Sequence, residues 1–84
     1  MFVMHNYRLR LSSAGMDEVY SSGRGECFDG FKRGLNAIET ENEKTGTITL
    51  RFSSSREIKT RDITQKLEEQ GLKIRILEFS EVVL

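Results

Sequence analysis

Few residues in this sequence have the type and spacing that chemistry requires. Cys27, the only cysteine, follows Gly25-Glu26 at the expected start of a helix, where the helix dipole can activate a thiol. A free cysteine is also among the most buried residue types, and no histidine partner is evident, so we interpret Cys27 as a small buried hydrophobe. His5, the only histidine, stands among apolar residues and is interpreted as a strand residue rather than a base or ligand.

A second candidate is the segment Gly23-Arg24-Gly25 before the same helix. Backbone amides and a helix N-terminus bind anions, so this segment could hold a phosphate. It completes neither a dinucleotide-binding motif nor a Walker motif, and we interpret it as a flexible loop. The residues therefore predict no catalytic site, no cofactor site and no metal site, and we expect a protein that is not an enzyme.

Length and composition predict one small domain, residues 1–84. The chain has 13 Lys and Arg residues and 13 Asp and Glu residues, so the total charge exerts no long-range attraction on nucleic acid or membrane. A single cysteine excludes an internal disulfide and a cysteine-built zinc site, and fits a reducing compartment. The first eleven residues lack the features of a signal peptide, and no apolar run could span a membrane, so we expect a cytoplasmic protein.

The clearest local pattern runs from Thr45 to Phe79. Residues 47–52 alternate between apolar and polar side chains, which is typical of a half-buried strand. A helix is expected at Thr60 to Gln70, with Thr60 as its cap and Gly71 as its end. Residues 72–76 alternate again and predict a second strand, most simply parallel to the first through a helical crossover.

The first half of the chain is less regular. A strand is expected within Phe2 to Leu11, and Ser12 to Gly25 is expected to be a loop with at most a short strand at Glu18 to Ser21. Glu26 to Ile38 predicts a helix, and Glu39 to Lys44 predicts a poor edge strand. The apolar residues of that helix recur at three- and four-residue spacing, and they are Phe28, Phe31, Leu35 and Ile38.

These elements predict an α+β fold with the ferredoxin-like order βαββαβ, in which two helices cover one face of a four-stranded antiparallel or mixed sheet. The alternative order ββαβαβ would use Glu18 to Ser21 as its second strand. Both orders leave the same strands in the centre and the same face open.

The second half of the chain resembles the heavy-metal-associated domain family. The motifs that carry this resemblance are Thr45-Gly46-Thr47-Ile48-Thr49-Leu50-Arg51-Phe52 and Glu69-Gln70-Gly71-Leu72-Lys73-Ile74. The resemblance implies the fold of that family, and a degenerate metal-chaperone-like domain is one function it allows. The family holds metal through Met-x-Cys-x-x-Cys, whereas the corresponding spacing from Met16 places Glu18 and Ser21 where the two cysteines belong. We therefore expect no metal binding.

The strand patterns predict a basic open face. If the apolar residues of each strand lie under the helices, several cationic side chains point to the opposite face, and acidic side chains are left to helices and loops. These predicted partner-binding residues are Arg8, Arg10, Arg51, Lys73 and Arg75. Long basic side chains can also simply cover a wet sheet face, which is the structural alternative.

The prediction for function is a small binding or regulatory module that uses this face for an acidic protein partner. Binding of a nucleic-acid phosphate backbone through the same face is the alternative, although only Phe79 could stack on a base. A homodimer joined by sheet edges, or by the helix that carries Gly30 and Gly34, is a further class.

Overall fold

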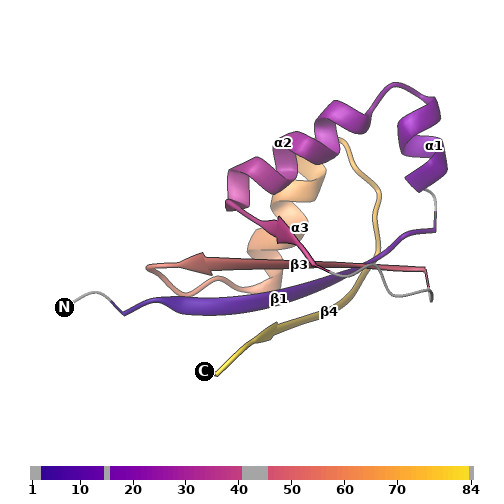
Figure 1. Cartoon of the computed structure of the whole chain (residues 1–84). Coiled ribbons are helices and arrows are strands. Elements are labelled where there is room, and N and C mark those ends of the chain that lie inside the picture. The colour runs from indigo at the N-terminus through magenta and orange to yellow at the C-terminus, as the bar shows by residue number, and fades with distance from the viewer. Residues whose placement is uncertain (1–2, 15, 41–45, 84) are drawn as a thin grey trace.

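A computed structural model of the chain describes residues 3–14, 16–40 and 46–83. Its elements in chain order are β1 (His5–Ser12), α1 (Met16–Ser21), α2 (Gly25–Leu35), β2 (Ile38–Glu39), β3 (Thr47–Ser54), α3 (Thr60–Glu69) and β4 (Ile76–Glu81). The four strands form one sheet in the order β2-β3-β1-β4, and each neighbouring pair is antiparallel. The helices lie on one side of this sheet (Figure 1), so its other face is open. The predicted α+β class is confirmed, and the described residues form three helices instead of the two expected.

The alternation predicted for the two central strands is confirmed. Tyr7, Leu9 and Leu11 of β1 are buried, and their partners across the β1 and β3 pair are the apolar residues of β3. Antiparallel partners share a face, so these side chains together form the floor beneath the helices. The buried apolar residues of the described chain are Tyr7, Leu9, Leu11, Met16, Phe28, Phe31, Leu35, Ile48, Leu50, Phe52, Ile58, Ile63, Leu67, Leu72 and Ile74.

Helix α2 is shorter than the sequence pattern predicts. Phe28, Phe31 and Leu35 are buried as expected, but Asn36 adopts a left-handed conformation with φ of 57° and ends the helix. The chain then enters β2, where Ile38 is 70% exposed. The prediction that Ile38 is the fourth core residue of this helix is therefore wrong, because the cap at Asn36 turns the chain before Ile38 can reach the core.

The segment between β1 and α2 holds a helix that the sequence reading missed. Helix α1 occupies the residues that were expected to be loop or strand, so the alternative order ββαβαβ is wrong. The backbone N–H of Met16 donates to the carbonyl of Ser13 at 3.0 Å, and Met16 and Val19, three residues apart, pack on the core. Two apolar residues among glycines and serines are too few for a helical period to be recognised.

Helix α3 follows the prediction closely. Ile63 and Leu67 are buried, and Ile58 before the helix is buried with them. The carboxylate of Asp62 accepts a hydrogen bond from the backbone N–H of Lys59 at 2.8 Å, which makes Lys59 the cap instead of Thr60. Gly71 has φ of 68°, the left-handed conformation expected after the helix.

The last strand begins later than predicted. Leu72 and Ile74 are buried, but residues 72–75 form a connection, and β4 begins at Ile76. β4 runs in the same direction as β3, because both are antiparallel to β1, which lies between them. The prediction that the strand begins at residue 72 is thus wrong, because Leu72 and Ile74 alternate through burial in the core and the ladder with β1 begins at Ile76. The last carbonyl before it, that of Arg75, accepts a hydrogen bond from the N–H of Ser12 at 2.9 Å.

Candidate functional site on the open sheet face

Two rows of side chains cross the centre of the open face. In the first row, Arg51 of β3 lies between Ile38 of β2 and Arg8 of β1, and Ser80 of β4 follows Arg8. The second row contains Thr49 of β3, Arg10 of β1 and Glu78 of β4. The structure therefore brings together three of the predicted partner-binding residues, Arg8, Arg10 and Arg51, on adjacent strands.

An acidic residue, Glu78, lies among these arginines. Nη2 of Arg8 donates to Oε1 of Glu78 at 2.9 Å, and the Ser80 hydroxyl donates to the same oxygen at 3.3 Å. The hydrogen bond from Arg8, together with the positive charges of Arg8 and Arg10, lowers the pKa of Glu78 against the opposing effect of desolvation. The face is therefore not uniformly basic.

The sequence missed Glu78 because regular alternation from Leu72, Ile74 and Ile76 predicts it on the helix side of the last strand. Residues 76–81 also alternate in polarity around Glu78, Phe79 and Ser80, which was the available signal. A register shift between Arg10 and Leu11 then sets which residues of β4 share a face with the arginines. Such a bulge inserts one extra residue in a strand and moves each later side chain to the other face relative to a regular pairing.

Arg51 differs from Arg8 in its surroundings. Arg51 is exposed and makes no ion pair with the described residues, and its two cross-strand neighbours are an arginine and an exposed isoleucine. Like charges placed opposite each other on adjacent strands are mildly destabilising. Arg51 is thus the cation of this face with the least compensation in the described structure.

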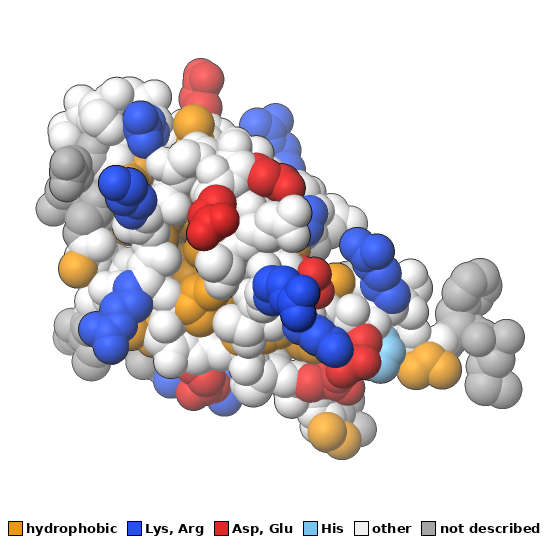
Figure 2. All heavy atoms as spheres, turned by 180° about the vertical axis from the view of Figure 1, so that it is seen from behind, with side chains coloured by type: hydrophobic (Ala, Val, Ile, Leu, Met, Phe, Trp, Pro, Cys, Tyr) orange, Lys and Arg blue, Asp and Glu red, His pale blue; other side chains and the backbone are white. Residues whose placement is uncertain are grey.

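Lys73 and Arg75, the other two predicted partner-binding residues, lie outside the sheet. They belong to the connection between α3 and β4, where both are exposed and line a hollow with α3 residues such as Leu67 and Glu68. Figure 2 views the molecule from behind and shows basic and acidic side chains interspersed, with hydrophobic side chains exposed between them. This side of the molecule is therefore mixed in charge. Glu41 and Glu43, two of the acidic residues that the sequence pattern leaves to the loops, lie outside the described residues.

One corner of the open face is hollowed, and we call it the corner hollow. It has a volume of about 390 Å³ and is lined by Met4, Asn6, Tyr7, Asn36, Ile38, Arg51, Phe52, Ser53 and Val82. The Ser53 hydroxyl donates to Oδ1 of Asn6 at 2.7 Å, which orders its floor. The rim is apolar and exposed at Met4 and Ile38. The corner hollow combines apolar contact area with one cation, Arg51.

The aromatic side chains of the sheet face the helices. The Phe79 ring stacks on Tyr7 with 5.1 Å between centroids, and it also stacks on Phe52. Phe79, which the sequence offered as the one ring able to stack on a base, therefore packs against the core instead. Within the described strands, the open face carries no aromatic side chain.

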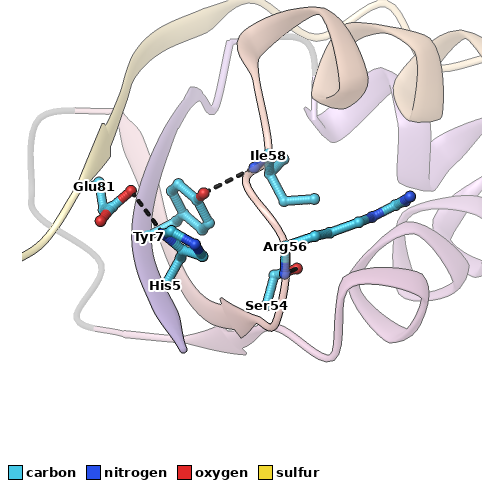
Figure 3. A network of polar contacts seen from close by, with 6 residues as sticks. All are labelled: His5, Tyr7, Ser54, Arg56, Ile58 and Glu81. Atoms are coloured by element: carbon cyan, nitrogen blue, oxygen red, sulfur yellow. Dashed lines mark hydrogen bonds and ion pairs between the residues drawn. The ribbon is translucent and has the colours of Figure 1, made fainter. Parts of the chain in front are cut away.

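The residues first considered for chemistry have structural partners. Cys27 is partly buried against the core, and no described group of three His, Cys, Asp or Glu side chains could hold a metal. Arg24 of the glycine-flanked segment donates from Nη1 to the carbonyl of Gly71 at 2.8 Å. His5 contacts Glu81, with 3.3 Å between Nδ1 and Oε1 (Figure 3). The side chain of Glu18 lies outside what the structure describes.

Comparison of the chain with protein-family models, with curated proteins and with solved structures finds no significant match. The resemblance to the heavy-metal-associated domain family therefore rests on the sequence motifs. No helix within the described residues is long and apolar enough to cross a membrane.

Proposed function

We propose that this chain is a small, non-catalytic binding module whose open sheet face contacts an acidic protein surface. The proposal includes a ferredoxin-like fold, in which the first strand lies in the centre between the third and fourth strands. The strand order β2-β3-β1-β4 with helices on one side supports that fold. A sheet with one open face can present side chains from several strands to a partner as one rigid surface.

The observation that carries the proposal is the pairing of Arg51 with Arg8. These two cations lie directly opposite each other on the central strands, and Arg10 follows Arg8 on the same face. Glu78 compensates Arg8, but Arg51 has no acidic partner among the described residues. A carboxylate supplied by a partner would offset the repulsion that the free protein carries, and this favours an acidic partner.

Nucleic acid fits this face less well. Glu78 lies next to the arginines and would repel phosphate, and the described face offers no ring for stacking. The two partners also differ in what they require: an acidic protein can place single carboxylates between cations, whereas a phosphate backbone presents a continuous row of charge.

A titration of the isotopically labelled chain tests the proposal. An unstructured peptide of alternating glutamate and serine should shift the backbone resonances of Arg8, Arg10 and Arg51, with an effect that falls as salt is raised. The matched neutral peptide, with glutamine for glutamate, is the first control. Arg61→Gln, which removes an exposed cation of α3, is the second and should bind as the unmodified chain does.

Two results would refute an acidic protein partner. One is equal shifts with the acidic and the neutral peptide. The other is tighter binding of a single-stranded oligonucleotide, lost in Arg51→Glu, which would establish the nucleic-acid alternative.

A further inference from the structure

We propose that the corner hollow binds an extended segment of the partner in which a carboxylate stands two residues from an aliphatic side chain. This inference rests on the proposed function, and it adds where on the open face the partner is recognised and by which chemistry. Three independent features of the corner support it.

The first feature is the charge of the hollow. Among the described residues that line the corner hollow, Arg51 is the one that is cationic, and no described carboxylate pairs with it. Its guanidinium offers donors in a planar arrangement that matches both oxygens of a carboxylate. A carboxylate of the partner placed here would also reduce the repulsion between Arg51 and Arg8.

The second feature is apolar surface beside that cation. Ile38 is 70% exposed and stands directly opposite Arg51 in the β2 and β3 pairing, and Met4, which also lines the hollow, is 52% exposed. Val82 completes this apolar rim. Covering exposed aliphatic side chains removes apolar surface from water, which is favourable. An aliphatic side chain of the partner would therefore be stabilised by contact with this rim.

The third feature is an open edge of β3. The pairing of β2 with β3 begins with Ile38 opposite Arg51, whereas β3 continues to Ser54, so no residue of β2 stands opposite Ser53. In an antiparallel ladder, alternate residues bond to the same neighbour. The carbonyl of Thr49 accepts a hydrogen bond from the N–H of Thr40, on the β2 side, at 2.9 Å. Ser53 lies four residues further along β3, so its backbone N–H and carbonyl point to the same side.

These features together define how a partner segment would lie. Backbone groups of Ser53 at this edge can hydrogen-bond an extended segment that lies across the corner hollow. Side chains two residues apart on such a segment point to the same side, so one can reach Arg51 and the other Ile38.

Three fluorescein-labelled peptides of equal length test the inference. The first is a serine peptide that carries a single glutamate and, two residues away, a single leucine. The second has serine in place of the leucine, and the third has glutamine in place of the glutamate. We expect the first peptide to bind about tenfold more tightly than either of the others, since its leucine is partly buried and its glutamate pairs with Arg51. Fluorescence polarisation measures the affinities, and NMR shifts of the Ile38 methyl groups and the Ser53 amide locate the site.

Two variants separate the outcomes. Ile38→Ser should lower the affinity of the leucine peptide to that of the serine peptide without changing the latter, and Leu77→Ser, which removes an exposed apolar residue of β4 outside the hollow, should have no effect. Equal binding of the first two peptides, or an unaffected Ile38→Ser variant, would overturn the inference and leave the acidic-partner function intact. Failure of every acidic peptide to bind would overturn both.

Discussion

The guanidinium of Arg8 donates a hydrogen bond to the carboxylate of Glu78, joining β1 to β4 across the open face with 2.9 Å between Nη2 and Oε1. This contact is the largest cause of the lowered pKa of Glu78. The same ion pair compensates the charge of Arg8, whereas the charge of Arg51 has no such carboxylate among the described residues.

The lowered pKa of Glu78 predicts acid sensitivity. The ordinary value is 4.5, so between that value and the lower folded-state pKa the unfolded chain binds more protons than the folded protein. The contribution of Glu78 to stability is therefore complete above about pH 4.5 and is lost as the pH falls through the folded-state pKa. Glu78→Gln should make the decline of unfolding free energy shallower in that range, measured by urea titration at several pH values. Glu69→Gln, which removes an exposed carboxylate of α3, is the matched control.

Removal of the Tyr7 hydroxyl should destabilise the fold. That hydroxyl accepts a buried hydrogen bond from the backbone N–H of Ile58 at 2.8 Å, which ties the approach to α3 onto the central strand (Figure 3). Tyr7→Phe leaves this N–H without an acceptor and should lower the unfolding free energy by about 1–3 kcal/mol. Tyr20→Phe, at an exposed position, should change it by less than about 0.5 kcal/mol. Equal effects of the two substitutions in urea unfolding would contradict this prediction.

Two glycines should respond oppositely to alanine. Gly34 lies within α2, and beyond the neighbouring backbone of its own helix no described atom lies within 4 Å of the position that a Cβ would take. Gly34→Ala should therefore stabilise the protein by about 0.5–1 kcal/mol through helix propensity. Gly71 has φ of 68°, so Gly71→Ala should cost about 1–2 kcal/mol. Thermal unfolding of both variants measures the difference, and a stabilised Gly71→Ala protein would be incompatible with the left-handed turn.

Arg51→Gln should weaken binding of an acidic partner but raise the unfolding free energy of the free protein. Because it removes one of two like charges that face each other across β1 and β3, the unfolding free energy should rise by about 0.2–1 kcal/mol, and added salt should reduce the gain. Arg61→Gln on α3 removes the same charge without such a neighbour and should show no comparable gain. If Arg51→Gln instead lowers stability at low salt, the repulsion inferred for the free protein is absent.

The sequence predicts the fold where a repeating pattern and burial coincide. The alternation of Tyr7, Leu9 and Leu11 and the helical spacing of Ile63 and Leu67 each mark a side chain that the structure buries. The prediction was wrong where a periodic pattern of apolar residues occurs outside the strand or helix that such a pattern usually marks. Leu72 and Ile74 alternate like a strand but contact helices, and Ile38 continues a helical spacing beyond the cap at Asn36.

The candidate site was predictable only in part, for a related reason. Arg8, Arg10 and Arg51 lie on strands whose facing is set by their own apolar neighbours, so their shared face follows from local pattern. Glu78 depends on the register of β4 against β1, including a bulge, and no local pattern encodes a pairing between residues 70 positions apart. The corner hollow depends on where β2 begins relative to β3, which is likewise a property of the assembled sheet.

The central place of β1 has a consequence for how the chain is made. β1 is synthesised first among the strands, yet one of its two neighbours, β4, is translated about 70 residues later, as the separation of Arg8 and Glu78 shows. Until then its side toward β4 stays exposed on the ribosome as a row of free backbone groups, open to pairing with other nascent chains. Contacts of such long separation also slow folding. We therefore expect the sheet to close only after β4 has left the exit tunnel, and the early chain to be the stage most prone to aggregation.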